Sequence, residues 1–312
     1  MKLVLLDAET LGNLPNMEEL RQFGQLECYL TTSPDEVIER IIDADVVLTN
    51  KVVLSRELLQ KAGNLRMICI LATGTNNIDL KAAEELGIHV KNVAGYSTNS
   101  VAQHTFAMLF NLVEHMSYYN DYVKSGDYEK SPVFTHLAKP YFELKDKVFG
   151  IIGLGTIGKR VAEIAAVFGA KVIYYSTSGN NNSETYERVD FVTLLNSADV
   201  ISIHAPLNDA TSNLIDQSAL GKMKPSAYLL NLGRGGIVNE SDLVDALNND
   251  VIAGAGLDVL EKEPMAQGHV SKDLLDQSRL LITPHIAWAS VEARTELMRL
   301  TIKNIKDHFN GE

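Results

Sequence analysis

The sequence predicts an α/β fold with two lobes, each built on a mostly parallel β-sheet covered by helices on both faces. Short β-rich runs alternate with helical patterns along the chain, in two series separated by a long apolar helix at 97–123. An amphipathic helix at about 290–309 is too short to be a domain, so we expect it to pack back on the first series. The first lobe is therefore expected to comprise residues 1–98 and 289–312, and the second lobe residues 99–288.

The first series is expected to supply five strands to one sheet. They are predicted at "KLVLLD" (2–7), "LECYLT" (26–31), "DVVLTN" (45–50), "RMICIL" (66–71) and "IHVKNV" (88–93). Helical patterns at 34–42 and 79–86 lie between these runs. Because parallel strands need crossover connections, which are usually helices, the alternation favours a parallel sheet over hairpins.

The stretch 97–123 is predicted to be one long helix that is apolar nearly all round. A helix that is apolar on every side is buried on every side. Such a helix runs between domains or into a subunit interface. We expect both here, with a homodimer formed through the part near 101–123. The polar segment 124–147 contains glycine and proline and is expected to be a loop.

The second series is expected to supply six further strands. They are predicted at "KVFGII" (147–152), "AKVIYY" (170–175), "DVISIH" (199–204), "AYLLNL" (227–232), "IAGAGLDV" (252–259) and "LLIT" (280–283). Helices are expected at about 156–168, 212–221 and 240–248. The same alternation as in the first series favours a second parallel sheet.

Composition and charge argue against several classes of partner. Hydrophobic residues make up 46% of the 312 residues and charged residues 22%, as in an ordinary globular protein. The net charge of −12 argues against nucleic acid and anionic membrane surfaces, because both bind through basic patches. Cys28 and Cys69 are too few and too far apart to indicate a disulfide framework or a metal site, so no metal is expected. No membrane-spanning run or signal peptide is recognisable, so we expect a cytoplasmic protein.

A glycine-rich turn, "GLGTIG", is the strongest indication of a cofactor. It follows a predicted strand and precedes a predicted helix and a further strand, which is the setting of a dinucleotide-binding turn. Gly153 allows the tight turn, Gly155 lets the backbone approach a pyrophosphate, and Gly158 lets the helix pack close to the strand. Thr156 and Ile157 open the helix, whose N-terminal N–H groups favour phosphate. We interpret the turn as a dinucleotide site rather than as a purely structural turn.

The residue that usually distinguishes NAD from NADP is missing. An acid is expected about 20 residues after the turn, where it would bind the ribose 2′-hydroxyl of NAD. That position is Ser176, within "VIYYSTSGNN". No carboxylate is there to repel the 2′-phosphate of NADP, and no arginine is there to bind it. The cofactor is therefore expected to be NAD or NADP, with the choice open.

Two predicted strands of the second lobe end in further candidate residues. The strand ending "SIHAPL" places His204 and Pro206 at the edge that faces a cofactor in this kind of sheet. We interpret His204 as part of the wall of the cofactor site rather than as a catalytic group. The strand ending "NLGRGG" places Arg234 between glycines, where a guanidinium can hold a carboxylate with two hydrogen bonds. A surface arginine on a flexible loop is the alternative for Arg234.

The last two strands of the second lobe end in acids and a histidine. Asp258 and Glu263 lie in "LDVLEKEP", and His285 lies in "TPHIAW". Carbonyl reduction needs a hydride donor, a proton donor near neutral pH and a group that orients the substrate. Histidine, with an unperturbed pKa of about 6.5, suits the proton donor, and a carboxylate on its other ring nitrogen would fix the tautomer. Because Arg234, Glu263 and His285 all follow strands of one sheet, they can converge at its edge.

These motifs together resemble the D-isomer-specific 2-hydroxyacid dehydrogenase family. "GLGTIG", "NLGRGG", "DVLEKEP" and "TPHIAW" occur in the order and at the spacing typical of that family, and "ATGTNNID" (72–79) and "STNSVAQHT" (97–105) extend the resemblance over the first lobe. The resemblance implies two Rossmann-like lobes, a substrate domain and a dinucleotide-binding domain, with the active site in the cleft between them. It also implies a homodimer.

The resemblance also implies roles for individual residues. Arg234 would bind the substrate carboxylate and carbonyl, and Glu263 would pair with His285, the acid/base. Backbone N–H groups at Thr73 and Gly74 would bind the substrate carboxylate, and Asp258 would contact the nicotinamide carboxamide.

The two first-lobe motifs look most like those of bacterial glycerate dehydrogenases, also called hydroxypyruvate reductases. The expected reaction is reduction of hydroxypyruvate or glyoxylate to D-glycerate or glycolate. Lactate, branched or aromatic 2-hydroxy acids are alternative substrates. A dinucleotide-sensing protein related to corepressors is an alternative of another class.

Overall fold

The computed structural model describes residues 1–271 and 279–309, and the chain divides into two compact units. Unit 1 comprises Met1–Ser97 and Trp288–Glu312, and unit 2 comprises Thr98–Ala287. The two boundaries expected from the sequence each lie one residue further along the chain. Each unit has one parallel β-sheet, which confirms the predicted fold class.

Unit 1 is built on a five-stranded parallel sheet in the order β2-β1-β3-β4-β5. Its strands are short: β1 (Lys2–Leu5), β2 (Gln25–Cys28), β3 (Val46–Thr49), β4 (Met67–Ile70) and β5 (His89–Lys91). The chain crosses from β2 over β1 to β3, so the order reverses at β1. In sheets of this kind ligands bind outside the carboxyl ends of the strands at such a reversal.

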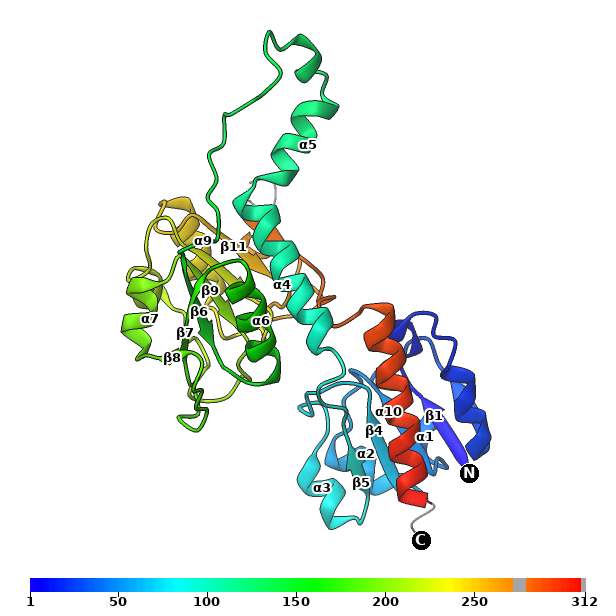
Figure 1. Ribbon diagram of the computed structural model, residues 1–312. Helices are drawn as coiled ribbons and strands as arrows, with labels where there is room; N and C mark the ends of the chain where they lie inside the picture. The colour runs from blue at the N-terminus through cyan, green and yellow to red at the C-terminus, as the bar shows by residue number, and fades with distance from the viewer. Residues whose placement is uncertain (272–278, 310–312) are drawn as a thin grey trace. The chain divides into compact units, whose positions relative to one another are not determined.

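Alternate side chains of β1 pack on opposite faces of the sheet. Leu3 and Leu5 belong to the core that includes side chains of α10 (Val291–Phe309), whereas Val4 and Leu6 belong to the core beneath the three short helices of the other face. Those helices are α1 (Val37–Ile41), α2 (Arg56–Lys61) and α3 (Leu80–Glu85). Figure 1 shows α10 lying along one face of the sheet. The C-terminal helix α10 thus packs on the first sheet and belongs to unit 1, as the sequence predicted.

Unit 2 is built on a seven-stranded parallel sheet in the order β12-β11-β10-β9-β6-β7-β8. Its strands are β6 (Val148–Ile152), β7 (Lys171–Tyr175), β8 (Glu187–Arg188), β9 (Val200–Ile203), β10 (Tyr228–Asn231), β11 (Gly254–Leu257) and β12 (Leu280–Ile282). The order reverses at β6, the strand that leads into the glycine-rich turn. The sequence did not predict β8, because a two-residue polar strand has no recognisable pattern.

Helices cover both faces of the second sheet. Side chains of α7 (Phe191–Ser197), α8 (Gln217–Leu220) and α9 (Glu240–Asn248) form one core with the strands. On the other face, α4 (Thr98–Val113) packs against β10 and β11, and α6 (Thr156–Val167) packs against β6, β7 and α4. This layered arrangement leaves the carboxyl ends of the strands for loops, which is where the candidate residues lie.

The long helix predicted at 97–123 is two helices. His115 adopts a left-handed conformation, with φ of 51°, between α4 and α5 (Met116–Lys124). α4 buries eight residues against unit 2, but α5 buries none. Figure 1 shows α5 and the segment after it extending away from the sheet of this unit. In the single chain α5 buries no residue and its Met116 and Val123 side chains are exposed, so the burial expected for this part of the stretch would require a second subunit.

No helix within the described residues is long and apolar enough to cross a membrane. The same residues contain no cluster of histidine, cysteine and acidic side chains that could hold a metal ion. Cys69 is buried and Cys28 is exposed, and both are free thiols.

Candidate active site

Glu263 and His285 form a hydrogen-bonded pair in unit 2. Glu263 Oε2 lies 2.7 Å from His285 Nδ1, and Glu263 Oε1 accepts the backbone N–H of Leu260 at 3.0 Å. Because a carboxylate can only accept, the pair places the proton of the imidazole on Nδ1. His285 also adopts a left-handed backbone conformation, with φ of 54°, which is unusual for a non-glycine residue and is often found at functional sites.

Asp258 holds the turn that carries His285. The carboxylate is only 2% exposed and accepts the hydroxyl of Thr283 at 2.6 Å and the backbone N–H groups of Ile286 and Ala287, both at 2.9 Å. Thr283 also lies 3.0 Å from the imidazole of His104 on α4. The left-handed conformation is thus fixed on both sides of the histidine by one buried acid.

Arg234 lies in a loop that is braced by the side chain of Asn231. Asn231 Nδ2 donates to the carbonyl of Arg234 at 2.9 Å, and its Oδ1 accepts the N–H of Gly233 at 3.1 Å. The guanidinium donates to the carbonyl of Gly233 at 2.8 Å. Arg234 is therefore not on an unstructured surface loop, because the last residue of β10 fixes the backbone around it.

Strand pairing brings the three loops to one edge of the sheet. Asn231, Leu257 and Ile282 are paired in register across β10, β11 and β12. Arg234 and His285 each follow three residues after their strand, and Glu263 follows six. The structure therefore brings the three predicted catalytic residues onto adjacent loops and pairs two of them directly.

The glycine-rich turn has the geometry of a dinucleotide cradle. Gly153 has φ of 92°, and a Cβ there would lie 2.9 Å from the backbone N of Ala205. A Cβ on Gly158 would lie 2.2 Å from the carbonyl of Gly153, whereas a Cβ on Gly155 would meet nothing within 4 Å. Thr156 and Ile157 form the first turn of α6. Two glycines are thus needed by the fold, and the third leaves open space where a ligand can approach.

His204 follows β9 and has a hydrogen-bonding atom without a partner. Its Nε2 lies 2.8 Å from Ser202 Oγ, but Nδ1 is buried and meets no partner within the described residues. Burial lowers the pKa of His204 to about 3, so the ring is neutral near pH 7. Pro206 is exposed on the following loop, and its carbonyl accepts the hydroxyl of Thr211 at 2.7 Å. An orphaned buried atom next to the glycine turn fits a site for a polar cofactor.

The structure places an arginine, Arg188, at the loop that follows Ser176, and the sequence did not predict it. Ser176 is 4% exposed and follows β7, in the position where an acid was expected. Arg188 on β8 donates to the carbonyl of Gly179 at 2.9 Å and lies 3.3 Å from Asn182 Oδ1. Because β8 pairs with β7, a residue twelve positions further along the chain reaches the loop that follows Ser176.

Comparison with known proteins bears directly on this geometry. Residues 106–287 match the family model described as "D-isomer specific 2-hydroxyacid dehydrogenase, NAD binding domain". Over 318 residues the chain is 38% identical to hydroxypyruvate reductase from Blautia hydrogenotrophica, covering 100% of this chain and 98% of that protein. The chain belongs to the D-isomer-specific 2-hydroxyacid dehydrogenase family. The resemblance inferred from the motifs is confirmed.

Two more known proteins are similar to the chain over nearly their whole length. Glycerate dehydrogenase from Methylorubrum extorquens is 35% identical, covering 100% of this chain and 97% of that protein. The structure of an acyclic imino acid reductase in complex with NADPH and D-Arg superposes with a TM-score of 0.88 at 29% identity, covering 100% of this chain and 98% of that one. The protein uses a nicotinamide dinucleotide, in keeping with the family's NAD-binding domain and with the cradle around Gly153.

Thr73 and Gly74, which resemblance to the dehydrogenase family implicates in substrate binding, lie in unit 1. They follow β4, and the turn is held by Thr73 Oγ1, which donates to the carbonyl of Val93 at 3.1 Å. Asn92 Nδ2 donates to the carbonyl of Thr73 at 2.6 Å. The turn is thus well fixed, while its role in binding substrate stays a prediction.

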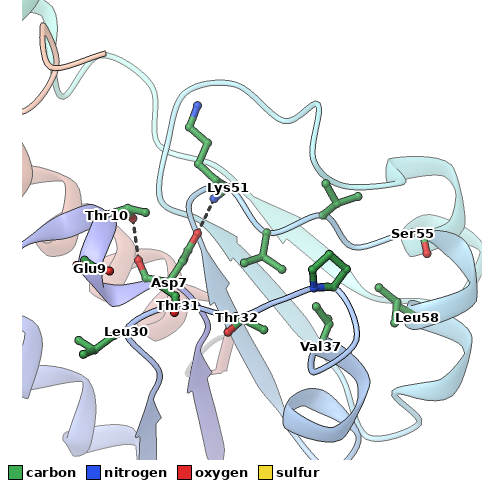
Figure 2. Close-up of a pocket in the computed structure, with 13 residues that line it drawn as sticks. Asp7, Glu9, Thr10, Leu30, Thr31, Thr32, Val37, Lys51, Ser55 and Leu58 are labelled. Atoms are coloured by element: carbon green, nitrogen blue, oxygen red, sulfur yellow. Dashed lines mark hydrogen bonds between the residues drawn. The ribbon is translucent and has the colours of Figure 1, made fainter. Parts of the chain in front are cut away.

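A pocket of about 650 Å³ lies in unit 1 of the dehydrogenase at the carboxyl ends of β1, β2 and β3. Figure 2 shows the Asp7 carboxylate directed at the backbone N of Lys51, while the Lys51 side chain extends away from it. Asp7 is 4% exposed and also accepts the N–H of Asn50 at 2.9 Å, so its charge is satisfied by the fold. None of the residues singled out in the sequence lines this pocket.

Proposed function

We propose that this protein reduces a small 2-oxo acid, hydroxypyruvate or glyoxylate, to the D-2-hydroxy acid. The observation that carries the proposal is the Glu263–His285 pair, 2.7 Å apart, on loops adjacent to that of Arg234. Similar proteins named hydroxypyruvate reductase and glycerate dehydrogenase support this substrate class over larger 2-oxo acids. A nicotinamide dinucleotide held by the cradle around Gly153 would supply the hydride to C2 of the acid, or accept it in the reverse direction.

His285 acts as the acid that protonates the carbonyl oxygen. Its Nδ1–H donates to Glu263, so Nε2 is the ring atom left to exchange a proton with substrate. Glu263 fixes that tautomer and stabilises the imidazolium. The left-handed turn and Asp258 hold the ring in place, which limits the reorganisation needed during reaction.

Arg234 binds the substrate carboxylate and polarises the carbonyl oxygen. A guanidinium is suited to both tasks because it presents parallel N–H donors and keeps its charge. Backbone N–H groups at Thr73 and Gly74 bind the same carboxylate. Asp258, which holds the turn of His285, would also contact the nicotinamide carboxamide of a bound dinucleotide. These assignments follow the family and the placement of each residue after a strand.

The loop after Ser176 binds the adenosine ribose, and Arg188 favours NADP over NAD. Residues 176–183 contain no acid that would repel a 2′-phosphate. Arg188, held at the carbonyl of Gly179, supplies a guanidinium at the same loop. The similar imino acid reductase forms a complex with NADPH, which is compatible with this preference.

The protein forms a homodimer through the segment that follows α4. α5 and residues 125–143 expose several large apolar side chains, whereas monomeric proteins seldom expose such a group together. These side chains are Met116, Val123, Tyr128, Val133, Phe134, Leu137 and Tyr141. Met116 and Val123 lie within the stretch 101–123 that the sequence indicated, and the proposed interface extends beyond it to Tyr141. The cytoplasmic location stays a prediction.

The test of the reaction is loss of 340 nm absorbance with hydroxypyruvate, run in parallel with NADH and NADPH. We expect rapid loss with at least one cofactor, and lower kcat/KM for pyruvate and for branched or aromatic 2-oxo acids. No turnover with any 2-oxo acid would contradict the proposal. It would favour the dinucleotide-sensing binding protein, which predicts cofactor binding without turnover.

His285→Gln tests the catalytic assignment. Glutamine keeps a side chain of similar reach but cannot supply a proton near neutral pH. We expect kcat to fall by about 10²–10⁴-fold while cofactor affinity, measured by fluorescence titration, changes little. Turnover retained within a few-fold of the parent would refute the role of His285.

A further inference from the structure

A second buried histidine–carboxylate pair lies in the part of unit 2 that carries Glu263. Glu240 Oε2 and His269 Nε2 are 2.7 Å apart, and only 10% and 9% of the two side chains are exposed. Neither residue is assigned above to substrate, cofactor or proton transfer. Because buried polar side chains are nearly always fully hydrogen-bonded, the partners of this pair indicate what it does.

The hydrogen bonds of His269 define its protonation. Its Nδ1 accepts the backbone N–H of Ser271 at 3.2 Å and lies 2.8 Å from the hydroxyl of the same residue. A backbone N–H can only donate, so Nδ1 is unprotonated and Nε2 carries the proton that is donated to Glu240. Ser271 is only 2% exposed, so its hydroxyl is not presented to a substrate at the surface. We therefore interpret the hydrogen-bonded series Ser271–His269–Glu240 as a structural support for the loop and not as a nucleophile site.

Glu240 binds the loop around Glu263 at two points. Its Oε1 accepts the backbone N–H of Glu261 at 2.6 Å, and its Oε2 accepts His269. One point lies two residues before Glu263 and the other six residues after it. Glu240 itself is the first residue of α9, where the helix N-terminus also favours a negative charge. The loop is thus anchored on a rigid element through a single carboxylate.

The loop that carries Glu263 also packs against Gly235, the residue next to Arg234. A Cβ on Gly235 would lie 1.8 Å from the carbonyl O of Leu260 and 2.6 Å from the N of Glu261, so only glycine fits there. The segment from Arg234 to Glu240 therefore contacts the loop of Glu263 through Gly235 near its start and through Glu240 at its end. Displacing the loop at Glu261 would shift Glu263 away from His285.

We propose that Glu240, together with His269, is a positioning residue that fixes Glu263 against His285. The inference rests on the proposed function, in which that pair carries out proton transfer. Glu240 acts only through the loop and is not itself a contact of substrate or cofactor. The carboxylate accepts from two donors, the backbone N–H of Glu261 and the ring N–H of His269, so two acceptor oxygens are required at this position.

Glu240→Gln is the test, because glutamine has one acceptor oxygen for two buried donors. We expect kcat to fall about 10- to 100-fold, as for a small misplacement of a catalytic group, while KM for the 2-oxo acid changes less than about threefold. Asp242→Asn is the matched control. Asp242 lies in the same first turn of α9, but its carboxylate accepts the N–H of Gln217 and not the loop. It should change kcat by less than about twofold.

A double-mutant cycle with Glu263→Gln separates positioning from general loss of stability. If Glu240 acts through Glu263, adding Glu240→Gln to Glu263→Gln should lower kcat by less than about twofold further. An undiminished effect in that background would overturn the proposal, as would a Glu240→Gln enzyme with parental kcat. Should Glu240→Gln fail to fold, His269→Gln keeps the bond to Glu261 and should show a smaller loss with the same dependence on Glu263.

Hydrogen–deuterium exchange gives a readout that does not depend on turnover. Glu240→Gln should speed exchange in a peptide spanning 259–264, and Asp242→Asn should not. If the parent protein reduces no 2-oxo acid, the proposed function fails while this measurement still decides whether Glu240 anchors the loop. Unchanged exchange in 259–264 would overturn the anchoring.

Discussion

At the scale of single residues, Arg188 provides a sharp test of cofactor choice. Discrimination between NAD and NADP depends on one phosphate, so a single guanidinium can change it by a large factor. Arg188 is exposed and is held at the loop by the carbonyl of Gly179 and by Asn182. A 2′-phosphate in that loop would form charge-assisted hydrogen bonds, each stronger than a neutral one.

Arg188→Gln should therefore lower kcat/KM for NADPH by about 10-fold or more and leave kcat/KM for NADH within about twofold. The loss corresponds to one or two charge-assisted hydrogen bonds. Arg299→Gln, which removes an exposed arginine paired with Glu296 on α10, is the control and should change neither value. Equal losses with both cofactors would show that Arg188 supports the loop rather than reading the phosphate.

The catalytic residues could be predicted from the sequence because each follows a strand within a short recognisable motif. Arg234 and His285 come directly after "NLG" and "TP", and the order of the strands alone brings them to one edge. Glu240, His269 and Arg188 could not be predicted, because their roles depend on partners 9 to 29 residues away in the chain. A polar residue near a helix start or on a two-residue strand carries no local signal of such a partner.

At the scale of elements, the turn between β6 and α6 contains two kinds of glycine. Gly153 and Gly158 are required by the fold, whereas Gly155 leaves space for a ligand. A Cβ on Gly158 would lie 2.2 Å from the carbonyl of Gly153, and overpacking of this kind typically costs about 1–3 kcal/mol. A Cβ on Gly155 would meet nothing within 4 Å, and its φ of −79° suits alanine.

Gly155→Ala should leave thermal stability almost unchanged, within about 1 kcal/mol, and should weaken dinucleotide binding by about 10-fold or more. Gly158→Ala should lower the melting temperature by several degrees, since about 1 kcal/mol shifts it by about 2–4 °C in a domain of this size. Gly63→Ala in unit 1, where a Cβ also meets open space, is the control for both assays. Parental dinucleotide affinity in Gly155→Ala would argue against the pyrophosphate lying over this turn.

Most strands and longer helices could be placed from hydrophobic patterning, but the break at His115 could not. The stretch 97–123 contains no glycine or proline, so the sequence carries no local signal to end a helix within it. A left-handed histidine is a consequence of where the chain goes next and not of its own preference. Helix α7 was not predicted either.

At the scale of the whole molecule, the segment after α4 is organised as an arm with its own small aromatic core. The rings of Tyr122 and His136 stack with centroids 3.8 Å apart, and His136 Nε2 lies 2.7 Å from the hydroxyl of Tyr118. These contacts hold the segment that carries His136 against α5. Phe134 and Leu137 lie on the same segment, yet they are 88% and 82% exposed. An ordered arm that presents its apolar side chains outward is what a subunit interface requires, because association would remove that surface from water.

Static light scattering after size exclusion should therefore report a mass near twice the 34.3 kDa of the chain. The double substitution Phe134→Asp with Leu137→Asp should shift the mass to that of one chain, because two carboxylates cannot be buried unpaired in an apolar interface. Val167→Asp is the control: Val167 is 87% exposed on α6, outside the arm, and its replacement should leave the mass unchanged. A parent protein of single-chain mass at tens of micromolar, or a dimer that survives the double substitution, would show that the arm serves another purpose.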